Sequence, residues 1–407
     1  MLTYDEALAL ILANSHPLPV VERPLSAILG HVLAEPLKTS FPLPLFDNSA
    51  VDGYGVRLAD TKNASPESPQ TLRLIGEIQA GGRAELALEP GSAMKIMTGG
   101  LVPRSVDAVV MREYCSEQNG SVAVGYAPEQ GENVRYKGAE MGAGEEVLPA
   151  GQRVTPPVVG MLATLGYAAY KVHAKPTVAI VATGDELVQP GKTLQAGQIY
   201  DSNSFALDAA VRALGVETTA ILHARDTREQ THKAFAEALA KSDVVISAGG
   251  VSVGDYDHVK DVLEQELGAK TIFWRVKIKP GKPVYFGAVG EKLVFALPGN
   301  PVSALITYHL FVKPALLKLI GVPEPEVERL PAVLKAPLRK KAGRLDFVRA
   351  LTVRASDNTL ALTATRGQDS HMLSGLAKAN SLIRFAADDE FMPEGTSTLV
   401  DMLRWSE

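Results

Sequence analysis

The pattern of apolar and polar positions changes character at residue 175. Beyond it, short apolar runs that suit buried strands alternate with longer runs of helical period. The expected strands are 177–182, 217–223, 243–247, 271–278, 284–287 and 293–297, and the expected helices are 204–214, 229–241 and 259–267. This order predicts a mainly parallel, doubly wound α/β sheet with helices on both faces.

Two other regions have the short, turn-bounded apolar segments of small β domains. The first group is 72–78, 93–97, 108–111 and 121–124. The second group, at 347–353 and 360–364, follows a long apolar helix that opens at Pro301 and a proline-bearing linker at 322–331. We therefore expect one β domain before the α/β sheet and one after it.

Helical signals frame the first β region. Thr3 is a candidate N-cap with Glu6 three residues on, and a helix-like run follows at 26–34. Thr155 and Pro156 open another helix, which we expect to return to the first forty residues. The first β region is then an insertion between two parts of another domain.

The predicted fold is thus a multidomain α/β plus β protein. Its domains are a discontinuous helical and mixed linking domain (1–44 and 142–174), an inserted β-rich domain (45–141), a central α/β domain (175–325) and a C-terminal β domain (326–407). A length of 407 residues suits several domains.

Composition narrows the functional classes. A net charge of −5 argues against sequence-independent nucleic-acid binding. The single cysteine, Cys115, excludes an intrachain disulfide and suits a reducing compartment. Acids stand near the N-terminus where a signal peptide would be basic, and we expect no apolar run of the roughly 18 residues that span a membrane. These features predict a cytoplasmic protein. The eight histidines are scattered, which disfavours an ordinary zinc site.

A glycine-rich loop is the first candidate site. The apolar run 243–247 stops at Gly249 and Gly250, and Ser252, Asp255 and Asp257 follow. Ligands bind at the carboxyl ends of strands in open α/β sheets, and glycines let backbone N–H groups approach an anion. The alternative is a tight turn without a ligand.

Acids follow the neighbouring strands as well. Asp185 and Glu186 come after the first strand and Asp226 after the second. Each alone is more often a helix cap or a solvated turn, but a shared sheet edge favours a functional cluster.

Cations gather around a Pro-Gly turn further on. Lys277, Lys279 and Lys282 crowd together there, an arrangement that favours an oxyanion among them. The alternative is a solvated surface turn. Asp52 lies in the polar segment 46–55 and Thr98 in a Gly-rich turn, where turn chemistry alone explains both.

Seven motifs, in this order and spacing, resemble those of the molybdopterin molybdenumtransferase family, which is called MoeA in bacteria and is related to the gephyrin E domain. They are FDNSAVDGYG, IMTGGLVP, TGDEL, GQIYDSN, SAGGVSVGDYD, KPGKPV and LPGNPVSA. The resemblance implies a four-domain protomer and a homodimer. The family's active site lies in a cleft between the α/β domain and the inserted β domain of the partner.

The resemblance also implies a reaction: insertion of molybdate into adenylylated molybdopterin, which releases AMP and molybdenum cofactor. A divalent cation such as Mg²⁺ takes part. The implied catalytic residues are Asp257, Glu186, Asp226, Asp52 and Thr98, with Asp257 and Glu186 as metal ligands. The implied substrate-binding residues are Gly249, Gly250, Ser252, Arg275, Lys279, Lys282, Arg349 and Ser370, of which Lys279, Lys282, Arg349 and Ser370 resemble the molybdate site.

Two departures from the family pattern stand out. Arg275 replaces an expected lysine, which keeps the charge but changes the geometry. Gly138-Ala139-Glu140 replaces the usual Gly-Glu-Asp, which puts a role for that loop in doubt.

Two alternative functions remain at this stage. The chain could adenylylate molybdopterin from ATP, or it could be a non-enzymatic scaffold like gephyrin. The family resemblance also points to the molybdopterin adenylyltransferase as a partner.

Overall fold

A computed structural model describes residues 1–82, 87–251, 258–325 and 327–405. The chain forms two compact units. Unit 1 comprises Met1–Glu35, Ala150–Val159 and Ala168–Glu407, and unit 2 comprises Pro36–Pro149 and Gly160–Tyr167. The predicted residues Ser252, Asp255 and Asp257 lie outside the described residues.

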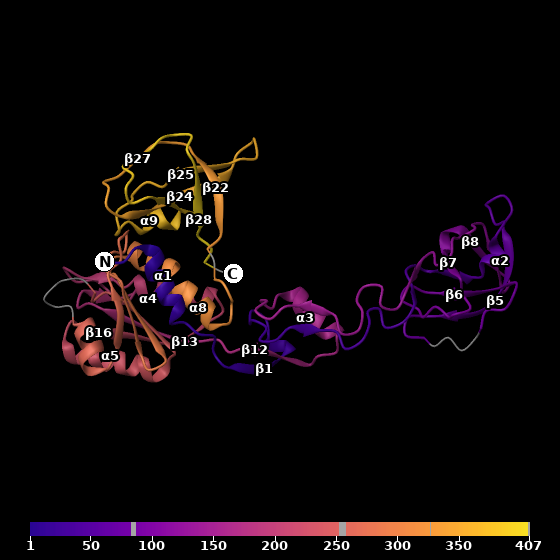
Figure 1. Cartoon of the computed structure of the whole chain (residues 1–407), viewed down its shortest axis with the longest axis horizontal. Coiled ribbons are helices and arrows are strands. Elements are labelled where there is room, and N and C mark those ends of the chain that lie inside the picture. The colour runs from indigo at the N-terminus through magenta and orange to yellow at the C-terminus, as the bar shows by residue number, and fades with distance from the viewer. Residues whose placement is uncertain (83–86, 252–257, 326, 406–407) are drawn as a thin grey trace. The chain divides into compact units, whose positions relative to one another are not determined.

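A six-stranded sheet forms the centre of unit 1 (Figure 1). Its strands, in spatial order, are β16 (Glu217–Ala224), β13 (Thr177–Thr183), β17 (Val244–Ala248), β21 (Lys292–Leu297), β20 (Tyr285–Val289) and β18 (Lys270–Trp274). The first four are parallel, and β20 and β18 add an antiparallel edge. The predicted mainly parallel sheet is present.

Helices cover both faces of this sheet because neighbouring strand residues point to opposite sides. Ile180 packs in one core with Leu207, whereas Val181 packs in another with Phe235. The helices of this region are α4 (Asn203–Ala213), α5 (Arg228–Lys241), α6 (Val259–Asp261), α7 (Pro301–Thr307) and α8 (Lys313–Leu319), with π-helical turns at Val262–Glu266 and Tyr308–Val312.

One predicted strand is divided between two sheets. The run expected at 271–278 ends as β18 at Trp274, and β19 (Ile278–Lys279) pairs instead with β24 of the C-terminal domain. Arg275 separates the two strands with a positive φ of 81°, which an extended strand cannot accommodate.

The C-terminal domain is a small closed barrel. Its strands pair in a ring of β24 (Leu345–Arg354), β25 (Leu360–Ala364), β22 (Arg329–Leu334), β28 (Ser397–Met402) and β26 (Ser381–Phe385), and β26 pairs again with β24. Short β23 (Leu338–Arg339), β27 (Phe391–Met392) and α9 (Leu373–Ala377) complete it. The predicted C-terminal β segments are confirmed.

The N-terminal segment Met1–Glu35 is part of unit 1. Helix α1 (Tyr4–Ala13) begins with the predicted capping box between Thr3 and Glu6 and buries Tyr4, Ala7 and Ile11. The helix expected at 26–34 is wrong.

In its place, β1 (Val20–Pro24) pairs with β12 (Ala169–His173), and a 3₁₀ turn follows at Leu25–Ala27. Val32 and Leu33 form strand-like bridges to Arg153 and Val172. This tertiary pairing overrides the local helical preference.

Unit 2 contains a six-stranded sheet of its own. In spatial order it is β7 (Ala108–Met111), β4 (Gly53–Val56), β6 (Ser92–Ile96), β5 (Gln70–Ile78), β9 (Ser121–Val124) and β8 (Cys115–Gln118), joined by the short helix α2 (Leu58–Thr61). The segments before and after this sheet in the chain form two short strand pairs, β2 (Leu37–Lys38) with β11 (Glu146–Leu148) and β3 (Asn48–Ser49) with β10 (Val134–Arg135). Helix α3 (Pro156–Thr164) opens at the predicted Thr155-Pro156.

The stretch Pro301–Leu319 corrects one expectation, because it is long and apolar enough to cross a membrane by length and composition. However, 89% of its apolar window is buried within the fold, as in the core helix of a globular domain.

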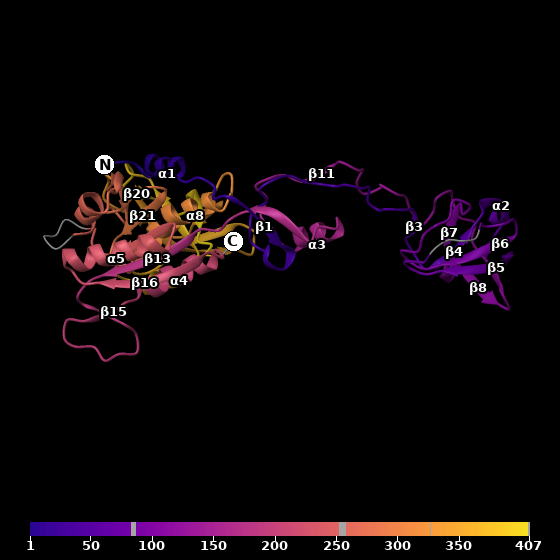
Figure 2. The ribbon, with the colours of Figure 1, turned by 90° about the horizontal axis from the view of Figure 1, so that it is seen from below.

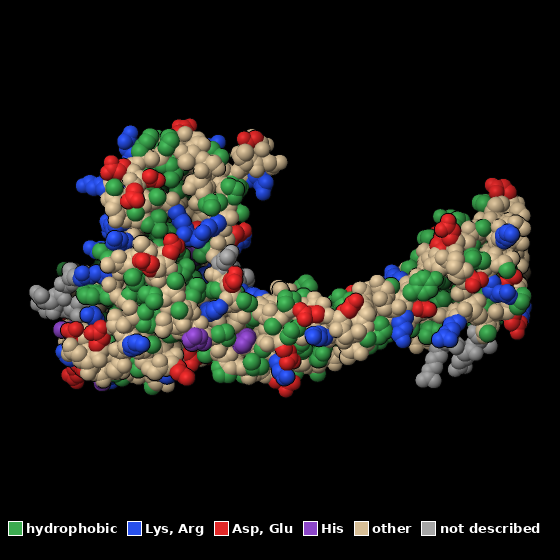
Figure 3. All heavy atoms as spheres, viewed as in Figure 1, with side chains coloured by type: hydrophobic (Ala, Val, Ile, Leu, Met, Phe, Trp, Pro, Cys, Tyr) green, Lys and Arg blue, Asp and Glu red, His purple; other side chains and the backbone are tan. Residues whose placement is uncertain are grey.

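Acidic and basic side chains are intermixed over the face that Figure 3 shows.

Candidate active site

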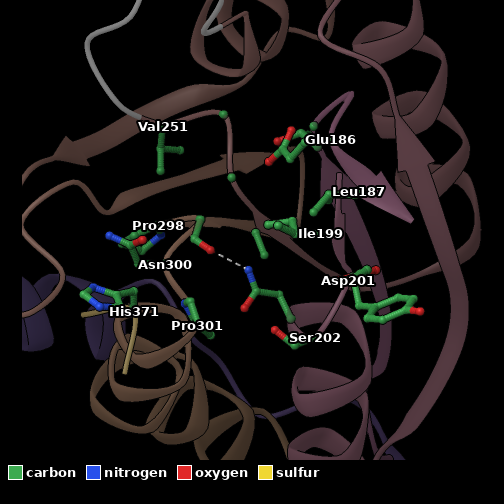
Figure 4. A pocket seen from close by; sticks show the side chains of 18 of the residues that line it. Glu186, Leu187, Ile199, Asp201, Ser202, Val251, Pro298, Asn300, Pro301 and His371 are labelled. Atoms are coloured by element: carbon green, nitrogen blue, oxygen red, sulfur yellow. Dashed lines mark hydrogen bonds between the residues drawn. The ribbon is translucent and has the colours of Figure 1, made fainter. Parts of the chain in front are cut away.

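A cavity of about 680 Å³ opens at the carboxyl ends of β13, β16 and β17 (Figure 4). Its lining includes Thr183, Glu186, Asp226, Gly249, Gly250 and His371. The structure therefore brings together four of the predicted site residues, Glu186, Asp226, Gly249 and Gly250, from three separate loops. This location is the sheet edge where α/β proteins bind ligands.

The glycine-rich loop presents bare backbone to the cavity. Strand β17 ends at Ala248, and Gly249 has a φ of 100°. A Cβ at Gly249 would lie 2.6 Å from Thr183 Oγ1 and 2.8 Å from the Thr183 carbonyl oxygen, so only glycine fits. The Thr183 hydroxyl is itself buried without a hydrogen-bond partner among the described residues.

The acidic side of the cavity depends on a second close approach. Glu186 folds back over Gly184, where a Cβ would lie 2.5 Å from Glu186 Oε2. The neighbouring Asp185 N–H donates to Asp226 Oδ2 at 3.4 Å, which links the loops after β13 and β16. The TGDE segment thus supplies the Glu186 carboxylate itself, and its Asp185 N–H helps to hold the Asp226 carboxylate.

The opposite wall comes from the loop after β21 and from the C-terminal barrel. Asn203 Nδ2 donates to the Gly299 carbonyl at 2.7 Å, and Asn300 Nδ2 donates to Ser370 Oγ at 2.9 Å. His371 follows on the barrel side (Figure 4). The barrel therefore contributes directly to the cavity of the α/β domain.

Four further residues of this cavity had no assigned role in the sequence-based prediction. They are Asp201, Asn203, Asn300 and His371. Their signals were present, since GQIYDSN and LPGNPVSA contain three of them and His371 adjoins Ser370. Asp201 is fully buried, accepts the Ser204 N–H through Oδ1 at 3.0 Å, and lies 3.8 Å from His223 Nε2.

Arg349 is only 1% exposed and makes contacts that local sequence could not indicate. Its guanidinium donates to the Gly367 carbonyl at 2.6 Å and to the Asp369 carbonyl at 3.2 Å. Burial lowers the pKa of Arg349 below its ordinary value. In this structure Arg349 holds the turn that carries Ser370, and its predicted contact with molybdate stays a prediction.

One lysine of the Pro-Gly turn, Lys279, has an acidic partner that the sequence did not indicate. Lys279 Nζ lies 3.6 Å from the buried Asp346 carboxylate, which is also 4.0 Å from Lys340 Nζ. Arg275 stacks its guanidinium over Trp274 at 4.1 Å. Lys279 and Lys282 lie outside the described cavity lining, although Pro283 belongs to it.

Sequence comparison places these features in a known family. Residues 2–166 match the MoeA N-terminal region (domains I and II), 179–318 match a probable molybdopterin-binding domain, and 331–403 match the MoeA C-terminal region (domain IV). A molybdopterin molybdenumtransferase of Haemophilus influenzae is 36% identical over 386 residues, which cover 94% of each chain. The chain belongs to the molybdopterin molybdenumtransferase family.

Other relatives agree with this assignment. Molybdopterin molybdenumtransferase 2 of Mycobacterium tuberculosis is 38% identical over 382 residues, which cover 93% of each chain. The crystal structure of a molybdopterin biosynthesis MoeA protein from Pyrococcus horikoshii superposes with a TM-score of 0.81 at 30% identity, covering 99% of this chain and all of that one. The family resemblance seen in the seven motifs is confirmed.

Unit 2 of this molybdenumtransferase-family chain carries the other predicted residues. Asp52 Oδ1 accepts the Thr98 N–H at 2.8 Å and the Thr98 hydroxyl at 2.7 Å. These bonds lower the pKa of Asp52 below its ordinary value. Asp52 also borders a hollow of about 320 Å³ with Lys95 and Arg112. Asp52 and Thr98, which the sequence analysis named as separate candidates, are thus hydrogen-bonded to each other.

Cys115 borders the same hollow and is half-buried. Burial raises the pKa of the Cys115 thiol to about 12, so this thiol is not a nucleophile at neutral pH.

Proposed function

We propose that this chain transfers molybdenum from molybdate to adenylylated molybdopterin and releases AMP. The observation that carries the proposal is the near end-to-end match to proteins named molybdopterin molybdenumtransferase. The cavity supports it chemically. Bare backbone at Gly249 and Gly250 suits phosphate oxygens, and Glu186 and Asp226 stand beside it. The chain is an enzyme of the transferase class.

The described carboxylates fit Mg²⁺. This cation takes one or two protein carboxylates and fills its remaining positions with water and phosphate oxygens. Glu186 would hold it, together with Asp257 from outside the described residues. When bound, the cation neutralises charge on the phosphates that separate.

The remaining roles, binding the phosphates and binding molybdate, fall to the chain's own residues. The Gly249 N–H donates to the Leu297 carbonyl at 3.0 Å, so Gly249 offers its bare Cα and Gly250 its backbone N–H to the phosphates. Ser252, which follows outside the described residues, is assigned to the same substrate group. Asp226 completes the acidic wall. We assign molybdate to Ser370, Lys279 and Lys282, with Arg275 nearby and Arg349 behind the turn, because a dianion needs several cationic and hydroxyl donors.

Three further features complete the proposal. The protein works as a homodimer in which Asp52 and Thr98 of one copy complete the cavity of the other. A molybdopterin adenylyltransferase supplies the adenylylated substrate. The reaction takes place in the cytoplasm, because a chain with a single cysteine forms no intrachain disulfide and suits a reducing compartment.

The decisive experiment mixes purified protein with adenylylated molybdopterin, molybdate and Mg²⁺, and measures AMP and pterin-bound molybdenum by mass spectrometry. We expect both to appear together, and Glu186→Gln to slow AMP release by roughly 10²- to 10⁴-fold. Consumption of ATP with AMP transfer to free molybdopterin would instead show the adenylyltransferase. Absence of both reactions would support a scaffold.

A further inference from the structure

His371 is a cavity residue without a role in the function proposed above. It belongs to the C-terminal barrel, whereas most of the cavity belongs to the α/β domain. Figure 4 shows His371 and Glu186 on opposite sides of the pocket. The ring is solvent-exposed, and none of the hydrogen bonds found among the described residues uses its nitrogens. It is therefore available to a ligand.

The turn that carries His371 is held from several directions. Arg349 donates to the carbonyls of Gly367 and Asp369, and Gln368 Nε2 returns a bond to the Arg349 carbonyl at 2.9 Å. On the cavity side, the Val302 N–H donates to the Ser370 carbonyl at 3.2 Å. The backbone around His371 is thus fixed by both domains, which positions the free imidazole.

The proposed reaction, on which this inference rests, requires proton movement at the metal. Two Mo–S bonds form to the two thiols of molybdopterin, and one Mo–O bond of molybdate breaks. The thiols lose two protons, and the departing oxygen gains two and leaves as water. Molybdenum keeps its oxidation state, so no oxidant or reductant is needed. A base that can accept a proton and return it is sufficient.

We propose that His371 carries these protons from the substrate thiols to the departing oxygen. His371 lines the cavity and follows Ser370, which the proposed function assigns to molybdate. Neutral imidazole has one basic ring nitrogen and one N–H, so the same ring can accept one proton and donate another.

The charged groups around the ring are consistent with this role. Glu186 lies across the cavity from it, Asp226 lines the same cavity, and Asp201 is buried in the wall. The proposed function assigns Glu186 and Asp226 to the phosphates. On its own turn, Asp369 precedes it, and the Arg349 guanidinium lies behind. Among the described cavity residues, His371 is the one histidine.

The test replaces His371 by Gln and measures molybdenum insertion under saturating substrates. We expect kcat to fall roughly 10²- to 10⁴-fold, the range for a lost acid–base group. The KM values for molybdate and adenylylated molybdopterin should stay within about threefold, because His371 acts on the proton and not on ground-state binding.

Two further variants make the result specific. His371→Ala should regain activity with added imidazole, which can occupy the space of the missing ring. His16→Gln is the matched control, because His16 is an exposed histidine of the same unit outside the cavity lining. It should behave as wild type.

Several outcomes would overturn the proposal. His371→Gln with at least half of wild-type kcat would do so, as would a raised KM with unchanged kcat, which would make His371 a binding residue. A slow His371→Ala variant that imidazole does not rescue and that melts early would make it structural. A wild-type protein that inserts no molybdenum would instead remove the proposed function, and this step with it.

Discussion

His309 lies on the π-helical turn Tyr308–Val312 and is 1% exposed, and neither ring nitrogen has a hydrogen-bond partner among the described residues. Burial, with lesser contributions from Lys313 and Arg384, lowers the pKa of His309 to about 3. The folded protein therefore holds a neutral imidazole at neutral pH. The ring meets Trp405 edge-on at 5.9 Å, which is an apolar contact.

This residue predicts a pH dependence of stability. In the unfolded chain His309 has a pKa near 6.5. Below that pH the unfolded state binds a proton at His309, whereas the folded state stays neutral there until about pH 3. Stability should be fully present above about pH 6.5 and fall by up to about 1.4 kcal/mol per pH unit toward pH 3. The melting temperature of His309→Leu, measured from pH 7.5 to 4.5, should fall less steeply than that of wild type, whereas His16→Gln should keep the wild-type slope. Superimposable wild-type and His309→Leu curves would refute this account.

Single residues also mark where sequence reasoning ends. Glu186, Asp226 and Gly249 could be placed at one edge because parallel strands align their carboxyl ends, and the structure gathers them there. The surroundings of Arg349 and Lys279 could not be inferred. Their partners, the Gly367 carbonyl and Asp346, are set by the barrel's tertiary packing and leave no periodic signal in the chain.

At the scale of elements, the loop after β13 positions the Glu186 carboxylate in the cavity. Beyond Glu186, β14 (Leu187–Val188) pairs with β15 (Ile199–Tyr200), and the intervening segment projects as a long loop (Figure 2). Gly184 has a φ of 147° and leaves the space that the Glu186 carboxylate uses. The position of this acid therefore depends on a missing side chain two residues earlier.

Gly184→Ala tests that dependence. The new Cβ would lie 2.5 Å from Glu186 Oε2, so the carboxylate must move, and a displacement of about 1 Å can cost roughly 10²-fold in rate. Gly191→Ala is the matched control, because Gly191 also has a positive φ, of 90°, but a Cβ there meets nothing within 4 Å. We expect AMP release to slow strongly in Gly184→Ala alone. Equal rates in the two variants would mean that Glu186 is not held by this contact.

A buried ion cluster joins α1 to the C-terminal barrel. Asp401 on β28 is fully buried and accepts from Arg384 Nε at 2.7 Å and from Arg329 Nε at 3.3 Å. The Arg384 guanidinium also lies 4.8 Å from the Tyr4 ring on α1. Burial raises the pKa of Asp401 despite both arginines, so its charge depends on these partners.

Arg384→Met should therefore destabilise the protein by about 3 kcal/mol, since it leaves a buried carboxylate with a single, more exposed partner. Arg384→Met with Asp401→Leu should recover most of that loss, because no charge then stays buried. Lys241→Met, which breaks an exposed pair with Glu237, should cost less than about 0.5 kcal/mol. These differences can be measured by urea unfolding. A double variant no more stable than Arg384→Met would contradict the account.

Helices and strands could be predicted where local periodicity or a cap determines them, and not where tertiary pairing does. The helix at Tyr4–Ala13 and most strands from Thr177 to Leu297 have strong periodicity or caps and form close to the expected bounds, whereas the strand expected at 271–278 is divided at Arg275. The helix expected at 26–34 failed because strand-like bridges from Val32 and Leu33 replaced it. The closure of the C-terminal strands into a barrel rests on the β24–β26 pairing, which joins segments separated by another strand and a helix.

At the scale of the whole molecule, the proposed site residues are divided between the two compact units. Glu186, Asp226 and His371 line the cavity of unit 1, and Asp52 with Thr98 lies in unit 2. Under the proposed function, Asp52 and Thr98 of one copy serve the cavity of a second copy. A reaction that needs both units is then a property of the dimer, and no single chain can complete it.

Complementation between defective chains tests this directly. Asp52→Ala and Glu186→Gln chains, each nearly inactive alone, are co-expressed with different affinity tags, and the mixed dimer is purified through both. One of its cavities combines the intact Glu186 of one chain with the intact Asp52 of the other, so it should show about half of wild-type activity per dimer. The matched control pairs a Glu186→Gln chain with an Asp226→Asn chain. In the proposed dimer both residues belong to the same chain's cavity, so each of the two cavities keeps one defect. Restoration in the first pair and not in the second is the expected result, measured as AMP released. A mixed Asp52→Ala and Glu186→Gln dimer as inactive as its parents would place both residues in one chain's site, and a monomeric, active wild-type protein in light scattering would exclude the shared cavity altogether.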